Sequence, residues 1–246
     1  LRVVYQKKEL ERVQKNGRRE DYYPTLLDFY NELKNSMRGL PPTSEEYREA
    51  SDILLTLELY TTGSFSLFAK PTNVNINNRF VVFDIKDLSS EIKTLGMLVV
   101  LDQIWNRIAM NREKNKRTWI YIDEIYLLFQ NEYSENFLFT LFKRSRKWGG
   151  IITGITQNVE DLLRSDLART MLANSTEFLI LFNQAPSDRD LLKNVLKLSD
   201  QEMRYISGSS AGQGLLGINH RWIPFYDKFP QTSEIYKLIT TKVGET

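Results

Sequence analysis

The stretch 118–130, "TWIYIDEIYLLFQ", places two adjacent acids directly after a run of residues that favour buried β-structure. Residues 119–122 have the length and composition of a short buried strand, and Asp123 and Glu124 follow where that strand would end. In open α/β sheets, ligands bind at the carboxyl ends of the strands. The two acids therefore mark a candidate site, and the elements around them indicate the fold.

From about residue 80, apolar runs of strand length alternate with helical patterns. The expected strands are "RFVVFDI" (79–85), residues 119–122, "GGIITGITQ" (149–157) and "EFLILF" (177–182), and the expected helices are 91–110 and 134–148. Continuous apolar strands separated by helices predict an α/β fold with a mostly parallel sheet covered by helices on both faces. A helix opened by Ser199 and Glu202 at capping-box spacing, a hairpin over 212–226 and a terminal helix are expected to follow.

Before residue 75 the pattern is helical and charged. We predict helices over 24–36 and 44–60, with Pro24 in the first turn of one helix and Thr43 and Glu46 as a capping box of the other. The sequence therefore predicts a helical subdomain over residues 1–75 and an α/β core over residues 76–246.

Composition excludes several kinds of site. The 246 residues are 41% hydrophobic, which is enough for a sizeable core, and they contain no cysteine, which excludes disulfides, thiolate metal sites and cysteine nucleophiles. The single histidine, His220, cannot form a histidine metal cluster, and we expect a structural or solvated role for it. The net charge of +2 gives no global attraction to nucleic acid or acidic membranes, so any basic site must be local.

The acids at the end of the 119–122 strand suit nucleotide chemistry. Asp123 could hold the magnesium ion of a nucleoside triphosphate, and Glu124 could orient and deprotonate the attacking water. The next strand ends in Thr156 and Gln157, whose amide could hydrogen-bond a γ-phosphate or that water. The alternative is that the acids cap the following helix and that Gln157 satisfies a loop backbone.

Two arginines lie between these strands, in "LFKRSRKWGG". On a helical wheel, Arg144 and Arg146 flank the apolar stripe, so either could reach the phosphates of a neighbouring subunit. The alternative is a solvated basic helix end that complements the C-terminal dipole.

The segments "VVFDIKDL", "TWIYIDEIYLLF", "KRSRKWGGIITGITQ" and "GQGLLGINHRWIPF", in this order, resemble the C-terminal domain of the large VirB/TraC-type ATPases of type IV secretion and conjugation. The resemblance covers about residues 80–240 and implies a RecA-like P-loop NTPase core of the FtsK and HerA class with a helical insertion subdomain. By resemblance, Asp123 and Glu124 match the Walker B acids and Gln157 the sensor glutamine. Arg146 matches the candidate arginine finger, with Arg144 in reserve.

The resemblance also implies cofactors and partners. It implies an ATP-hydrolysing motor that uses ATP and Mg²⁺ and assembles as a homo-oligomer, a hexamer in the family. The implied partners are other type IV secretion channel subunits and a coupling ATPase, with DNA or protein as the transported substrate. The implied location is the cytoplasmic side of the bacterial inner membrane, with peripheral association.

One departure from the family pattern is that none of the twelve glycines is followed by lysine, so the phosphate-binding G-x-x-x-x-G-K-[ST] loop is missing from this sequence. We expect that the loop belongs to a preceding segment and that residues 1–246 alone are folded but inactive. The alternatives are a degenerate, non-hydrolysing assembly module, or an FtsK/HerA-like DNA translocase with the same hydrolytic residues.

Overall fold

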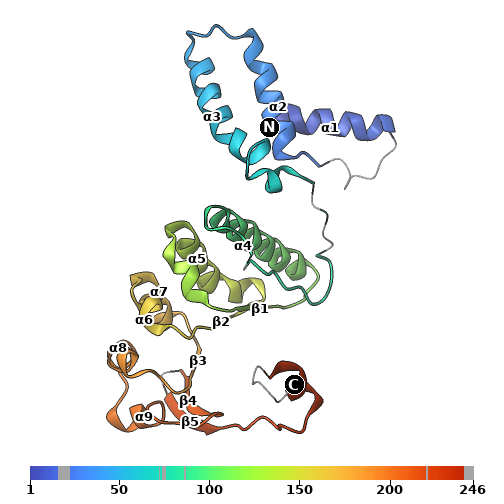
Figure 1. The fold of residues 1–246 in the computed structure, drawn as a ribbon. Coiled ribbons are helices and arrows are strands. Elements are labelled where there is room, and N and C mark those ends of the chain that lie inside the picture. The colour runs from blue at the N-terminus through green and yellow to red at the C-terminus, as the bar shows by residue number, and fades with distance from the viewer. Residues whose placement is uncertain (16–22, 72, 74–75, 86, 220, 241–246) are drawn as a thin grey trace. The chain divides into compact units, whose positions relative to one another are not determined.

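The chain forms two compact units, Leu1–Asp84 and Ile85–Thr246 (Figure 1). The computed structural model describes residues 1–15, 23–71, 73, 76–85, 87–219 and 221–240. The boundary between the units lies nine residues after the 75/76 boundary expected from the sequence. The first unit is helical, and the second combines helices with two small sheets. That the first unit is an insertion within a larger core stays a prediction.

Two helices of the first unit begin at side-chain caps. Its elements are α1 (Arg2–Lys15), α2 (Leu26–Ser36), η2 (Met37–Gly39), α3 (Glu45–Thr61) and η3 (Ser66–Ala69). Helices α2 and α3 confirm the two predicted helices, but the predicted starts were wrong. Thr25 caps α2 and Ser44 caps α3, whereas Pro24 and Thr43 each lie one residue before the cap. In each helix the next residue, Thr25 or Ser44, has a hydroxyl that accepts a hydrogen bond from a free backbone N–H group of the first turn.

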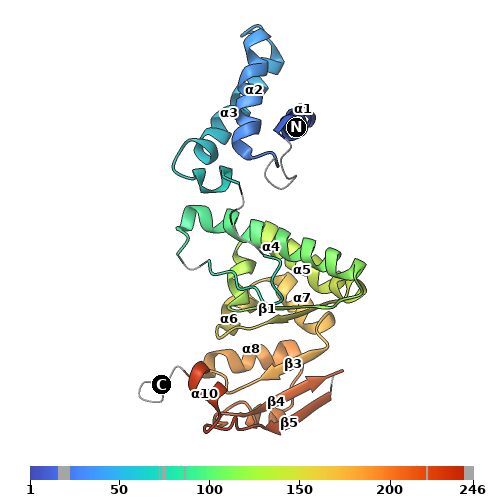
Figure 2. The same cartoon turned by 90° about the vertical axis from the view of Figure 1, so that its right-hand side faces the viewer.

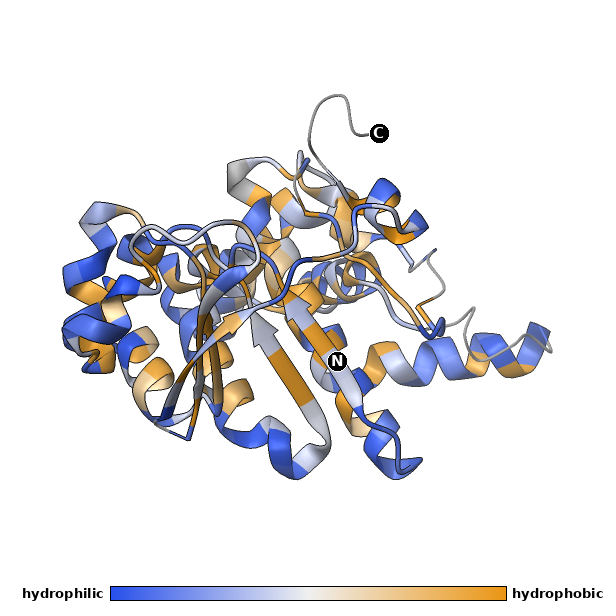
Figure 3. Cartoon of the chain, turned by 90° about the horizontal axis from the view of Figure 1, so that it is seen from below, coloured by the Kyte–Doolittle hydropathy of each residue, from blue (hydrophilic) through white to orange (hydrophobic). Residues whose placement is uncertain are grey.

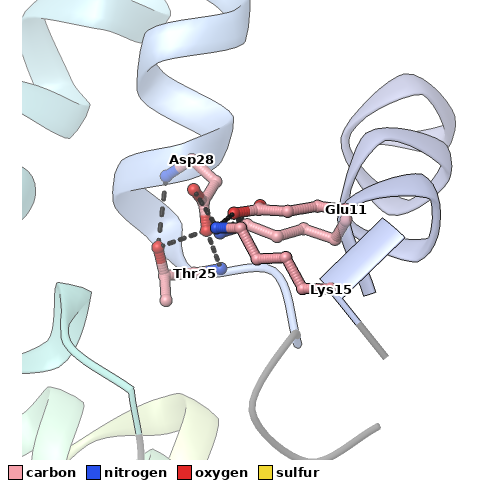
Figure 4. A network of polar contacts seen from close by, with 5 residues as sticks. Glu11, Lys15, Thr25 and Asp28 are labelled. Atoms are coloured by element: carbon pink, nitrogen blue, oxygen red, sulfur yellow. Dashed lines mark hydrogen bonds and ion pairs between the residues drawn. The ribbon is translucent and has the colours of Figure 1, made fainter. Parts of the chain in front are cut away.

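The cap of α2 is a reciprocal capping box that also ties α1 to α2 (Figure 4). The Thr25 hydroxyl accepts from the Asp28 backbone N–H at 3.2 Å, and the Asp28 carboxylate accepts from the Thr25 N–H at 2.8 Å. Lys8 of α1 pairs with Asp28 at 3.0 Å. Burial raises the pKa of Asp28, but the hydrogen bonds from Thr25 and Lys8 outweigh it and hold that pKa below its ordinary 3.8.

The first layer of the second unit is a pair of parallel strands covered by helices (Figure 2). In chain order it contains α4 (Ser90–Glu113), β1 (Thr118–Ile122), η4 (Ile125–Gln130), α5 (Glu132–Trp148), β2 (Gly150–Gly154), α6 (Val159–Leu163) and α7 (Asp166–Asn174). Its core buries Ile108 of α4, Ile120 of β1, and Leu138 and Leu141 of α5. Helix α5 is amphipathic, since it buries Leu138 and Leu141 and exposes Glu132 and Lys147. The hydropathy colouring shows hydrophilic and hydrophobic residues interspersed along the helices (Figure 3).

The remaining strands form an antiparallel sheet in the order β3, β4, β5. This part of the chain contains β3 (Phe178–Leu181), α8 (Pro186–Leu196), α9 (Asp200–Arg204), β4 (Gln213–Ile218), β5 (Arg221–Tyr226) and the terminal helix α10 (Glu234–Ile239). The Ser199–Glu202 capping box and the β4–β5 hairpin confirm two predictions from sequence. His220 lies outside the described residues, so the structural or solvated role expected for it stays a prediction.

Two expectations about strands need correction. The segment 79–85 forms no ladder with any described strand, and its Phe80 side chain is 83% exposed. A strand needs a neighbour to accept its backbone hydrogen bonds, and apolar composition alone does not provide one. Within the described residues, parallel pairing is confined to β1 and β2, while β3, β4 and β5 pair antiparallel. The α/β class itself is confirmed.

Candidate functional site

The carboxyl ends of β1 and β2 are joined by backbone hydrogen bonds just beyond the strands. The parallel register places Ile122 opposite Gly154. The Ile155 N–H then donates to the Ile122 carbonyl at 2.8 Å, and the Ile125 N–H donates to the Ile155 carbonyl at 2.9 Å. These two bonds hold the turn containing Asp123 and Glu124 against the start of the loop after β2. The acids are thereby fixed at the strand end where sequence placed them.

The turn itself has an unusual backbone. Glu124 has φ 47° and ψ 49°, the left-handed region that side chains other than glycine and asparagine rarely occupy. Its N–H donates to Asp123 Oδ1 at 3.0 Å, which stabilises the turn from within. Glu124 Oε2 lies 3.5 Å from the Gln157 N–H, at the outer limit of a hydrogen bond. The structure therefore brings Asp123, Glu124 and Gln157 together.

Gly154 at the end of β2 makes a close contact with Ile125, the residue after Glu124. A Cβ atom on Gly154 would lie 2.6 Å from Cδ1 of Ile125, closer than real Cβ contacts. Ile125 is buried in the core beneath the helices. Glycine at the end of β2 therefore lets the Ile125 side chain pack directly over the strand, and any larger residue would require that side chain to shift.

The loop after β2 has its own local order. The Thr156 hydroxyl accepts from the Asn158 N–H at 3.1 Å, and the Asn158 side chain caps α6 by accepting from the Asp161 N–H at 3.1 Å. Gln157, held between them, is exposed at the strand end. The hydroxyl and the cap thus hold the loop, and the Gln157 amide remains available to a ligand.

The two candidate arginines lie at the opposite edge of the strand pair. Both sit in the last turns of α5, which is capped by Gly149 (φ 75°), and β2 begins at the next residue. A five-residue strand separates the two edges by about 16 Å. Neither arginine can therefore reach the acids of its own chain.

Arg146 has a partner that the sequence did not suggest. Its Nη1 lies 2.5 Å from Oε1 of Glu177, the residue before β3, and the two side chains are 84% and 55% exposed. The only sequence signal for this pair was an acid preceding an apolar strand. Such a signal cannot identify a partner 31 positions away.

The carboxylates at the carboxyl edge of the strand pair could hold Mg²⁺ only together with ligands from a bound nucleotide and water. Within the part of the chain that the structure describes, no three His, Cys, Asp or Glu side chains cluster as a metal site. Asp123 and Glu124 offer carboxylate oxygens, and Mg²⁺ commonly binds through one or two carboxylates together with phosphates and water. The pair thus suits Mg²⁺ that arrives with a nucleotide, and Asp123 is the better placed to hold it because Glu124 faces Gln157.

The arrangement of acids, glutamine and parallel strands agrees with what a comparison of sequences finds. The profile of the TraG P-loop domain family matches residues 8–216, which is most of the chain. The chain belongs to this family. The match begins within α1 of the helical unit, so this TraG-family chain resembles its relatives in both units.

Known relatives support the resemblance to VirB/TraC-type ATPases predicted from sequence. The type IV secretion system protein VirB4 of Bartonella quintana is 24% identical over 136 residues, and an uncharacterized protein of Bacillus anthracis is 25% identical over 229 residues. The structure of VirB4 of Thermoanaerobacter pseudethanolicus matches with a TM-score of 0.70 and 25% identity over 87% of this chain. The recognition and the RecA-like α/β fold are confirmed.

The TraG-family chain is shorter than the proteins it matches. It spans 57% of the Thermoanaerobacter chain, 35% of the Bacillus anthracis protein and 17% of Bartonella VirB4. The Bacillus anthracis match covers 81% of this chain, and the Bartonella match covers 54% of it.

Among the described residues of this chain, no helix has the length and apolar character needed to cross a membrane.

Proposed function

We propose that this TraG-family chain is the C-terminal part of a type IV secretion or conjugation motor that hydrolyses ATP to drive assembly or substrate transfer. The observation that carries the proposal is the turn of Asp123 and Glu124, held by backbone hydrogen bonds beside Gln157 at the carboxyl ends of two parallel strands. Carboxyl ends of parallel strands are where nucleotides bind in this fold class.

Each side chain has a separate role in the proposed reaction. Asp123 would hold Mg²⁺, directly or through water, and the bound ion would neutralise charge on the phosphates. Glu124 orients the attacking water and takes its proton, since a carboxylate within reach of the water serves as a general base. Gln157 donates its amide hydrogens to the γ-phosphate or to the water. The proposal requires a phosphate cradle, and residues 1–246 contain no Gly-Lys pair.

The family supports further parts of the proposal. We expect Arg146, or Arg144 in its place, to act on the nucleotide of a neighbouring subunit in a homo-oligomer, a hexamer by analogy. We expect the protein to work on the cytoplasmic side of the bacterial membrane with other secretion channel subunits and a coupling ATPase. The naming of Bartonella VirB4 as a type IV secretion system protein supports this setting.

The test is Glu124→Gln in the full-length protein. We expect ATP binding to be retained and ATP turnover to fall by at least about a hundredfold, the usual scale for loss of a general base. The matched control is Glu132→Gln, a nearby exposed acid in the first turn of α5 that lies outside the Asp123–Glu124 turn, and it should keep normal turnover. Turnover that is equal in the two variants would refute the assignment of Glu124.

A further inference from the structure

Arg146 and Arg144, the two candidate fingers, lie in the same last turns of α5 but differ in their surroundings. The Nη1 group of Arg146 donates to Oε1 of Glu177 at 2.5 Å. The Arg144 side chain is exposed and has no ion-pair partner among the residues that the structure describes. One of the two arginines is therefore held by a carboxylate of its own chain, and the other is not.

The end of α5 that carries Arg146 is fixed by close packing. Ser145, the preceding residue, is buried, and a Cβ atom on Gly150 of β2 would lie 3.1 Å from the Ser145 Cβ. The Gly149 N–H donates to the Arg146 carbonyl at 3.3 Å and closes the helix. The backbone of Arg146 therefore has a defined position relative to β2.

Glu177 is fixed through both of its neighbours in the chain. The Thr176 hydroxyl donates to the Met171 carbonyl of α7 at 3.0 Å. Phe178, the first residue of β3, pairs with Ile218 of β4. Since the residues on either side are held, Glu177 presents its carboxylate to Arg146 from a fixed backbone.

Stability alone gives little reason for this ion pair. Its side chains are 84% and 55% exposed, and exposed ion pairs contribute little to the free energy of unfolding. The guanidinium of Arg146 has five N–H donors, and the contact with Glu177 engages Nη1. Because the side chain stays largely exposed, its remaining donors are open to a phosphate.

We infer that Glu177 is a positioning residue that holds the Arg146 guanidinium ready for the nucleotide of a neighbouring subunit. The inference rests on the proposed function, in which that arginine acts from one subunit on the next. A free arginine loses rotamer freedom when it binds a phosphate, whereas an arginine already held by a carboxylate has less to lose. Donors that are ordered before the reaction stabilise the transition state more effectively than donors that must first be ordered.

Glu177→Gln in the full-length protein tests this role. We expect kcat to fall about tenfold, because displacement of a group by about 1 Å can cost up to about a hundredfold. ATP affinity should stay within about twofold and the denaturation midpoint should not move, since the lost ion pair is exposed. Affinity for ADP with aluminium fluoride, a mimic of the phosphate in transfer, should also fall about tenfold, and this readout does not depend on turnover.

Double variants show whether Glu177 acts through Arg146. In an Arg146→Ala background, Glu177→Gln should lower neither kcat nor affinity for the mimic any further, because no guanidinium is left to position. In an Arg144→Ala background it should still lower both about tenfold. The matched control is Glu32→Gln, which breaks an ion pair of the same 2.5 Å length with Lys7 in the helical unit and should keep parent turnover.

Three results would overturn this inference alone, provided that Arg146→Ala itself has lost hydrolysis. One is parent turnover in Glu177→Gln, and another is raised turnover, which would make Glu177 a restraint on the arginine. The third is an equal loss in the Arg146→Ala background, which would mean that Glu177 does not act through Arg146. If the parent protein does not hydrolyse ATP, or if Arg146→Ala keeps parent turnover, the proposed function or its finger fails and this inference falls with it.

Discussion

At the scale of single residues, Gln157 matters because its backbone and side chain face different partners. The backbone N–H lies toward Glu124, while the exposed amide is available to a ligand. We expect Gln157→Ala in the full-length protein to lower kcat more than ATP affinity, since the backbone contact survives and the proposed amide contact matters mostly in the transition state. Steady-state kinetics and nucleotide titration measure the two effects. A loss confined to affinity would instead indicate a ground-state binding role.

Gly154 links core packing to the position of the acids. We expect Gly154→Ala to destabilise the protein by about 1–3 kcal/mol, because the new methyl group would overlap Ile125 in a packed core. Denaturant unfolding measures this change, and the double variant Gly154→Ala with Ile125→Val should recover part of it. If Gly154→Ala leaves stability unchanged, the turn is not held by this contact.

The identities of the site residues followed from sequence more readily than their geometry did. The sequence predicted that Asp123 and Glu124 lie at a strand end, because the apolar run that forms the strand stops directly before them. The left-handed backbone of Glu124 and the Arg146–Glu177 pair did not follow. The Glu124 conformation and the Arg146–Glu177 pair both depend on contacts between segments far apart in the sequence, and a local sequence pattern cannot predict such contacts.

At the scale of elements, the start of α2 gives a pH-dependent prediction. Because the pKa of Asp28 is lowered in the folded state, its stabilising contribution is present above its ordinary value of 3.8 and is lost as the pH falls through the lower folded pKa. We expect Asp28→Asn to destabilise the helical unit by about 1 kcal/mol near neutral pH. The difference from the parent should shrink as the pH falls below 3.8.

Circular dichroism melts across this pH range would measure the effect. The control is Asp52→Asn, an exposed acid within α3 that caps no helix, and it should show little change at any pH. An Asp28→Asn penalty that stays constant down to the acid end of the range would mean that the carboxylate charge does not stabilise the capping box.

Elements with a strong periodic pattern were predicted well, and elements that depend on a neighbour were not. The pattern over 91–110 gave α4, and hydroxyl-acid spacing gave the cap of α9, because both are local properties. The apolar run 79–85 met the same local criteria for a strand but pairs with no described strand. The direction of strand pairing could not be predicted from composition either, since β3 has the composition of a buried parallel strand but pairs antiparallel with β4.

At the scale of the whole molecule, the two edges of the β1–β2 pair bear on the proposed arginine finger. The acids and Arg146 lie at opposite edges, so Arg146 could serve the proposed reaction only from another subunit. We expect Arg146→Ala in the full-length protein to keep its fold and nucleotide binding while losing most hydrolysis, on the order of a thousandfold for such fingers. Assays of ATP turnover and binding on the same sample separate these effects.

Mixing Arg146→Ala with Glu124→Gln tests the trans arrangement directly. Mixed assemblies can pair an intact Glu124 with an intact Arg146 from a neighbour, so some activity should return. If mixed assemblies form and only the pair of Arg144→Ala with Glu124→Gln regains activity, the finger is Arg144. Recovery by neither pair would rule out a trans-acting arginine on α5.

The left-handed backbone at Glu124 bears on how this protein responds to selection for heat resistance. A side chain other than glycine in this conformation costs about 1–2 kcal/mol, so a glycine there would relieve strain at once. A search guided only by melting temperature would therefore favour Glu124→Gly and discard the carboxylate in the same step. Under the proposed role of Glu124, this position gives up thermal stability for the chemistry of one side chain.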